Sequence, residues 1–149
     1  MAAKCYGDFP LNLGGSAASG GAPMDFLSDT IKATLHNSYT PNQTTHKLFA
    51  TTGVSSTELA TAGGYTAGGY TLAAKTWTVS SLTSTFDNTT DPNWTSASFT
   101  CDTLILWDDT PTTPLDPLVC YDNFGTQTVT SATFTYVVAA TGFFSIAVS

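Results

Sequence analysis

The residues most suggestive of chemistry form a repeated glycine element, "AGGYTAGGYTL", from Ala62 to Leu72. A glycine-rich loop binds phosphate when a helix follows it, because the free backbone N–H groups at the helix start then point at the anion. Here the next residues, "AAKTWTV", favour a strand, and Lys75 comes too late after Gly69 to be a P-loop lysine. The element is therefore predicted to be a pair of tight turns that lead into a strand at Thr76–Ser81.

Acidic residues cluster by sequence around a proline-rich loop, "DDTPTTPLDP", which begins at Asp108. Glycoside hydrolysis uses two carboxyl groups across a sugar, so a pair of these residues is one candidate for catalysis. Aspartate is also a common turn residue, and Asp108 with Asp109 lacks the spaced pattern of a calcium loop. We therefore expect turn-forming aspartates with no catalytic or metal-binding role. The acidic cluster consists of Asp102, Asp108, Asp109, Asp116 and Asp122, and the turn role is expected for the three that flank the loop, Asp108, Asp109 and Asp116.

The histidines and cysteines show no catalytic or metal-binding spacing. No Gly-x-Ser-x-Gly elbow accompanies His36 or His46, and we expect both to be ordinary exposed histidines. The three cysteines, Cys5, Cys101 and Cys120, contain no Cys-x-x-Cys pair and do not group with the histidines. They are expected to be buried thiols, and no cofactor is expected.

The three tryptophans raise the possibility of a sugar-binding platform. Trp77 and Trp107 follow strand alternation, so we expect both to lie in the core. Trp94 follows the turn signal "TTDPN" and is the one expected to be exposed.

Composition and charge exclude several classes of protein. The chain has 149 residues, of which only 10% are charged, and its net charge is −7 with no arginine. Nucleic-acid binding relies on clustered basic residues, so neither nucleic acid nor an anionic membrane is an expected partner. No stretch resembles a signal peptide or approaches the ~20 apolar residues of a membrane helix. We expect the chain to be made in a bacterial cytoplasm.

Thr, Val, Tyr, Phe and Trp are abundant and predict an all-β fold. Alternation predicts a half-buried strand at residues 31–36, and a strand at Ser96–Trp107 whose odd-numbered residues from Phe99 share one face. Further strands are expected at Leu118–Tyr121, ended by "DNFG", and at Thr126–Ala140. A final hairpin is expected at Thr141–Gly142. Roughly seven or eight short strands indicate an antiparallel β-sandwich or barrel, jelly-roll-like in architecture.

The first 27 residues differ from the rest and are predicted to form an extended N-terminal arm, with the β domain at 28–149. Apolar residues precede and follow the linker-like "GGSAASGGAP" at Gly14–Pro23. Disordered tails rarely carry so many apolar side chains, so we expect them to form a protein interface. The predicted interface residues are Tyr6, Phe9, Leu11, Leu13, Met24 and Phe26.

Several motifs in order resemble a group of small structural proteins from tailed bacteriophages. They are "SYTPN" at 38–42, "GYTAGG" at 64–69, "DDTP" at 108–111 and "YDNFG" at 121–125. The resemblance covers about residues 30–149 and leaves the predicted arm unexplained. It implies a virion component without catalytic residues, and the role we expect is capsid decoration, also called cement.

A decoration protein of this kind binds the outer surface of the phage head across junctions between major-capsid subunits. The expected partners are the major capsid protein and further copies of the chain, as a homotrimer that matches a three-fold position of the shell. The alternative is a head-fibre or receptor-binding module that recognises host-surface glycan through Trp94 or the threonine-rich loops. A small glycan-active enzyme is a third possibility, but we expect no enzymatic activity.

Overall fold

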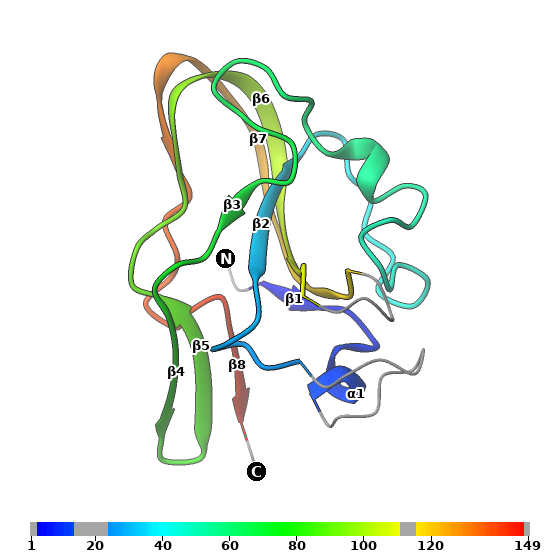
Figure 1. The fold of residues 1–149 in the computed structure, drawn as a ribbon, viewed down its shortest axis with the longest axis vertical. Helices are drawn as coiled ribbons and strands as arrows, with labels where there is room; N and C mark the ends of the chain where they lie inside the picture. The colour runs from blue at the N-terminus through cyan, green and yellow to red at the C-terminus, as the bar shows by residue number, and fades with distance from the viewer. Residues whose placement is uncertain (1–2, 14–23, 111–115, 148–149) are drawn as a thin grey trace.

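Two long strands, β6 (Asn93–Asp108) and β7 (Leu118–Thr135), run antiparallel through the protein and organise its fold (Figure 1). The computed structural model describes residues 3–13, 24–110 and 116–147. Threonine and apolar residues, which favour a pleated backbone, are frequent in both strands. The other elements are placed around this pair.

Two antiparallel sheets make up the fold, so the prediction of an all-β, sandwich-like architecture is confirmed. The five-stranded sheet has the order β1-β7-β6-β2-β3 and adds to the long pair β1 (Lys4–Cys5), β2 (Ile31–His36) and β3 (Tyr70–Thr71). The three-stranded sheet has the order β4-β5-β8 and consists of β4 (Lys75–Ser80), β5 (Thr83–Asn88) and β8 (Phe144–Ala147). The described helical segments are α1 (Phe9–Leu13) and a 3-10 turn, η1 (Ser55–Thr57).

A sharp bend in β6 and β7 turns the long pair back over itself (Figure 1). The ring centroids of Phe124 and Phe134 lie 6.2 Å apart, although a straight strand would separate these residues by about 33 Å. Ser96 in β6 and Ser131 in β7 have positive φ angles of 54° and 50°, and the pairing register shifts on both sides of Ala97. Bulges of this kind let strands pass between the layers of a sandwich.

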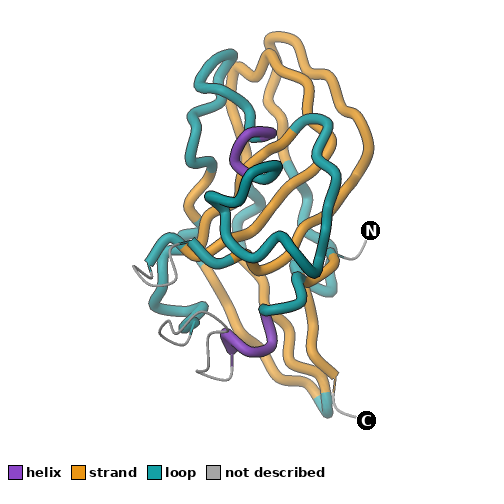
Figure 2. Tube along the Cα trace, turned by 90° about the vertical axis from the view of Figure 1, so that its right-hand side faces the viewer, coloured by secondary structure: helices purple, strands orange, loops and turns teal. Residues whose placement is uncertain are grey.

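The hydrophobic core has two parts, one on each face of the five-stranded sheet. The larger part joins β2 and β6 to the three-stranded sheet, and it includes Ile31, Leu35, Leu104, Phe86 and Phe144. The smaller part lies under the segment that follows β2, where loops cross the strands (Figure 2). Its buried members are Tyr6, Tyr39, Val54, Ile105, Trp107, Leu118 and Tyr121.

β2 is buried on both faces, so the prediction of a half-buried strand is wrong. Ala33 and Leu35 contribute to the larger part of the core, while Thr34 and His36 are also fully buried. The reason is the covering segment between β2 and β3, which includes Tyr39 and Val54. The alternation of residues along a strand cannot show that another segment covers its second face, because polar residues on that face are predicted to face solvent.

β6 changes faces along its length, so the prediction of one continuous face from Phe99 to Trp107 is wrong. Cys101 and Leu104 belong to the larger part of the core, whereas Ile105 and Trp107 belong to the smaller part. The pairing register with β7 shifts just after Cys101. A shift in register moves every later side chain to the other face.

Two predicted features near the C-terminus are also wrong. "DNFG" does not end a strand, because β7 continues through Gly125, whose φ of 80° accommodates the irregular pairing. Thr141–Gly142 forms a turn, but β8 pairs with β5 and not with β7, so no hairpin is formed. Gly142 is required here because a Cβ atom would lie 2.4 Å from the carbonyl oxygen of Phe86.

Candidate protein-interaction surface

The residues predicted to form an exposed interface are mostly buried in the β domain. Leu13 is half-buried, and Leu11, at 48% exposure, is the one exposed side chain among the six. The prediction of an extended arm is not confirmed, because the described part of residues 1–27 packs into the core. The predicted linker, Gly14–Pro23, lies outside the described residues. The four buried members are Tyr6, Phe9, Met24 and Phe26.

Backbone pairing explains why the N-terminal segment folds back. β1 pairs antiparallel with β7, and the Tyr6 N–H donates to the Val119 carbonyl oxygen at 3.1 Å. The ring of Phe9, in α1, then packs edge-on against Phe144 and Phe26, with centroid distances of 4.8 Å and 5.8 Å. Aromatic burial of this size outweighs the cost of ordering a short segment.

An apolar groove opens where this segment meets the three-stranded sheet. Its volume is about 460 Å³. Trp77 of β4 forms one wall, and its ring lies 5.6 Å from that of Phe26. Three of the six predicted interface residues therefore do line one surface, although they do so as its walls and not as an extended arm. The lining residues are Leu13, Met24, Asp25, Phe26, Leu27 and Trp77.

The apolar character continues beyond the groove along the three-stranded sheet. Trp77, Phe86 and Phe144 are direct neighbours across β4, β5 and β8, and they face the core. Two residues further along each strand, on the same face, lies a second row, which we call the distal row. It consists of Val79, Ser84 and Ile146.

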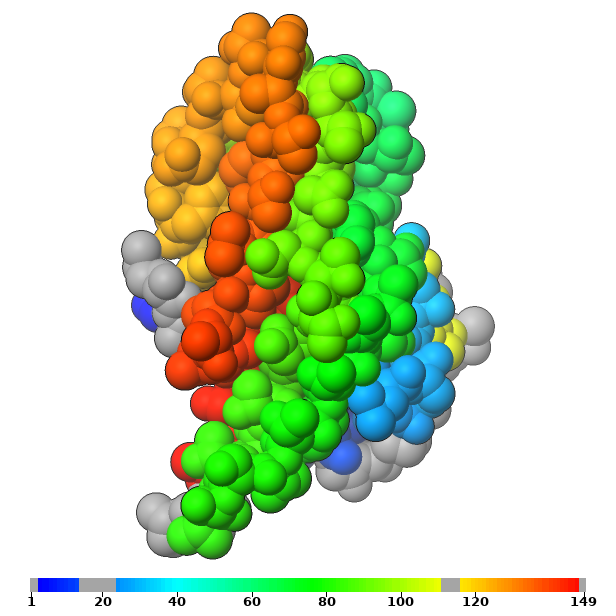
Figure 3. All heavy atoms as spheres, turned by 90° about the vertical axis from the view of Figure 1, so that its left-hand side faces the viewer, coloured from blue at the N-terminus to red at the C-terminus, as the bar shows by residue number. Residues whose placement is uncertain are grey.

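The distal row extends past the end of the core. The β4–β5 hairpin projects at one end of the molecule beside β8 (Figure 3), and Val79 and Ile146 are 69% and 39% exposed. Leu82 at the tip of the hairpin and Leu27 beside the groove are also exposed, at 66% and 56%. Exposed apolar side chains grouped in this way mark protein-interaction surfaces.

The sequence did not indicate this surface, although it contained one signal. The stretch between Lys75 and Asp87 has no charged residue, which is unusual for a hairpin exposed to water. The alternation of Trp77 and Val79 predicted one apolar face, but it could not show where the core ends beneath that face. The structure shows that the end of the core lies between these two residues.

The histidines are not placed for catalysis. His36 is fully buried, so the prediction of an exposed histidine is wrong for this residue. Its ring nitrogens lie 3.0 Å from the hydroxyls of Thr34 and Thr57. Burial lowers the pKa of His36 to about 4, which keeps it neutral and structural. His46 is partly buried, and its Nδ1 lies 2.9 Å from the Tyr39 hydroxyl.

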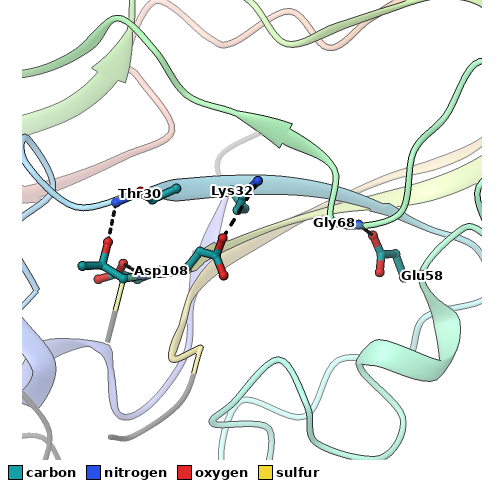
Figure 4. Close-up of polar contacts among 7 residues, drawn as sticks. Thr30, Lys32, Glu58, Gly68 and Asp108 are labelled. Atoms are coloured by element: carbon teal, nitrogen blue, oxygen red, sulfur yellow. Dashed lines mark hydrogen bonds and ion pairs between the residues drawn. The ribbon is translucent and has the colours of Figure 1, made fainter. Parts of the chain in front are cut away.

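The acidic residues hold loops in place. Asp108 is fully buried at the end of β6, where its Oδ1 accepts the N–H of Thr110 at 2.9 Å (Figure 4). Burial and the neighbouring Asp29 raise the pKa of Asp108 to about 7. Asp109 pairs with Lys32 at 4.0 Å on the surface. The turn-forming role predicted for these aspartates fits the Thr110 contact, but the complete burial of Asp108 was not expected.

The glycine element is a pair of turns that lies against the five-stranded sheet, and the predicted strand follows it as β4. Glu58 accepts the Gly68 N–H at 2.7 Å (Figure 4), and it also accepts the Tyr65 hydroxyl at 2.7 Å. The Gly63 carbonyl oxygen accepts the Ser98 N–H of β6 at 2.8 Å. Gly69 has a φ of 70° and lies directly against the backbone of β2. These contacts serve packing, as the sequence predicted.

The cysteines are free thiols, and Trp94 lies in the core. Cys101 and Cys120 are buried and Cys5 is partly buried, all as free thiols. Within residues 3–13, 24–110 and 116–147, no three His, Cys, Asp or Glu side chains are grouped so as to hold a metal ion. Trp94 is only 6% exposed and packs against Phe134, so the prediction of an exposed tryptophan is wrong.

Comparison with known protein families, curated proteins and solved structures finds no significant match. In the part of the chain that the structure describes, no helix has the length and apolar character to cross a bilayer. The interpretation of the surface therefore rests on its geometry. The groove and the distal row together offer mainly apolar contact area.

Proposed function

We propose that the protein is a non-enzymatic virion structural protein, a decoration (cement) protein of a tailed-phage head. It binds the outer capsid surface across junctions between major-capsid subunits and stabilises the shell. The supporting observation is the apolar groove that continues onto the exposed distal row. The capsid as the partner is suggested by the sequence motifs shared with small phage structural proteins.

The physical argument concerns many weak contacts. Covering Val79, Ile146 and Leu27 would contribute on the order of 1 kcal/mol each, because each is already partly buried. Such a contact is weak for one chain, but copies held in a symmetric oligomer bind together and gain avidity. The oligomer would be a trimer at a three-fold position of the shell or a dimer at a two-fold position.

Co-sedimentation with undecorated capsids tests the proposal. The double variant Val79→Glu/Ile146→Glu should lose binding, because it places two negative charges in the distal row. The matched control Thr44→Glu/Thr45→Glu carries the same added charge in an exposed loop and should bind like the unmodified protein. Equal binding of both variants would show that the distal row is not the contact.

The alternative function, recognition of host glycan, loses its main support because Trp94 is buried. It predicts binding on a glycan array without co-sedimentation with capsids. That pair of results would replace the decoration role with a head-fibre or receptor-binding role.

A further inference from the structure

β7 has a long backbone edge that is not paired. β1 and Tyr6 cover β7 only at Val119, Cys120 and Tyr121, while β6 pairs along the opposite edge. Between Thr126 and Thr135, no other described strand and no backbone hydrogen bond of the described residues covers the outer edge. In Figure 3 this part of β7, in yellow to orange, forms one border of the molecule.

The part of this edge between two irregularities is Thr126–Thr130, with the sequence "TQTVT", and its central residues Gln127, Thr128 and Val129 pair in regular register with β6. It lies between Gly125 and Ser131, whose positive φ angles of 80° and 50° interrupt the strand on either side. All of its residues are exposed except Val129, which is half-buried. Proteins usually protect an exposed edge with lysine, another charge, proline or a β-bulge. Thr126–Thr130 has no charge and no proline, and the irregularities of this edge lie at its two ends.

Charge distribution indicates what can approach this edge. The chain carries 11 acidic and 4 basic residues, and all of them precede Asn123. Two copies with a net charge of −7 repel each other wherever their charged surfaces meet. Thr126–Thr130 carries no charge, and Asp122, the acidic residue of the adjoining recess, is only 6% exposed, so two copies can make contact at this edge with little repulsion.

A recess beside the edge offers further contact area. It has a volume of about 310 Å³ between the two arms of the bent strand pair, and Val137 at its rim is 73% exposed. A second molecule on the β7 edge would cover this rim. The lining residues are Asp122, Phe124, Gln127, Phe134, Thr135, Tyr136 and Val137.

We propose that Thr126–Thr130 pairs antiparallel with the same segment of a second copy, around a two-fold axis at Thr128. Thr126 then lies opposite Thr130 of the other copy, and Gln127 opposite Val129, so the segment is complementary to itself. A trimer would instead require β7 to pair with a different edge. The other available described edge strands have 2 residues in β3, 6 in β4 and 4 in β8. β4 is at least as long as Thr126–Thr130, but it carries the charged Lys75, whereas Thr126–Thr130 carries no charge. The dimer does not depend on the capsid role.

Charged substitutions at the residues that face each other across the two-fold axis test this pairing. Thr126→Glu/Thr130→Glu places glutamates opposite each other in both symmetric pairs and should weaken dimerisation by about tenfold or more. Thr126→Glu/Thr130→Lys places opposite charges in the same two pairs and should restore it. The loop variant Thr44→Glu/Thr45→Glu, which adds as much negative charge as the first variant, should dimerise like the unmodified protein.

Sedimentation velocity over a range of concentrations measures the association, and circular dichroism shows whether each variant is folded. In hydrogen exchange of the unmodified protein, amides in residues 126–130 should gain protection as concentration rises, while those of β4 should not. A monomer at every concentration, a trimer, or no change in protection at 126–130 would overturn the proposal. Loss of association in both charge variants would overturn the register.

Discussion

The hydroxyl oxygens of Tyr6 and Tyr39 lie 2.6 Å apart in the smaller part of the core. Tyr6 follows β1 and Tyr39 follows β2, so this contact joins the N-terminal segment to the segment that covers the five-stranded sheet. The Tyr39 hydroxyl also lies 2.9 Å from His46 Nδ1. Burial raises the pKa of Tyr39 to about 12 and that of Tyr6 still further, so both phenols stay neutral near pH 7.

Replacing Tyr6 with phenylalanine should lower the free energy of unfolding by about 0.5–1.5 kcal/mol, because it removes one buried hydrogen bond and keeps the ring. Urea denaturation followed by fluorescence measures the change. Tyr70→Phe is the matched control, since no hydrogen bond of the Tyr70 hydroxyl is found among the described residues. Equal stability of the two variants would show that the contact between the tyrosines contributes nothing.

Deleting Met1–Ala22 should destabilise the β domain. The deletion removes β1, Tyr6 and the buried ring of Phe9. Truncation of a buried phenylalanine alone lowers the free energy of unfolding by about 3–5 kcal/mol. Phe9→Ala in the full chain should therefore reproduce a large part of the loss, while Leu11→Ala, at an exposed site in the same helix, should change stability little. A truncated protein that melts at the temperature of the full chain would restore the interpretation of residues 1–22 as a separate arm.

Gly69→Ala should be more destabilising than Gly68→Ala. Both residues have positive φ angles, of 70° and 92°, where alanine costs on the order of 1 kcal/mol. A Cβ atom on Gly69 would in addition lie 2.2 Å from the carbonyl oxygen of Ala33, whereas one on Gly68 would meet nothing within 4 Å. Chemical denaturation of the two variants measures the difference, and similar losses would mean that β2 moves aside easily.

The fold class was predictable because local alternation and composition both indicated strands. The bounds of β2 and β4 are close to those expected, since these strands keep a regular period. The bulge after Cys101 and the continuation of β7 through Gly125 were not predictable, because each depends on pairing with a distant strand. The turn at Gly142 was recognised, but its strand pairs with β5 because Gly142 packs against Phe86.

The candidate surface was predictable only in part. The N-terminal apolar residues were recognised as unusual, and Leu13, Met24 and Phe26 do line the groove. A sequence does not show whether an apolar segment packs on its own domain or on a partner, because both uses require the same side chains. The burial of His36 and Trp94 was not predicted for a related reason. The residues that bury these two side chains come from segments distant in sequence.

Asp108 should make the stability of the protein depend on pH. Its carboxyl is fully buried and its Oδ2 has no hydrogen-bond partner among the described residues, so burial and the neighbouring Asp29 raise its pKa and favour its protonated form. Lys75 lies nearby, but its ammonium donates to the Asp29 carbonyl oxygen, and Lys32 pairs with Asp109. Neither cation therefore neutralises Asp108.

The folded pKa of Asp108, about 7, lies above its ordinary value of 3.8. Between these values the folded state binds more protons than the unfolded state, so the free energy of unfolding should fall as pH rises from about 4 to 7. Asp108→Asn should flatten this dependence and raise stability at pH 8, because its amide can donate to Asp29 without carrying charge. Asp109→Asn, at the exposed neighbour, should leave the slope unchanged. Urea denaturation at several pH values measures both variants, and an unchanged slope in Asp108→Asn would show that Asp108 does not cause the pH dependence.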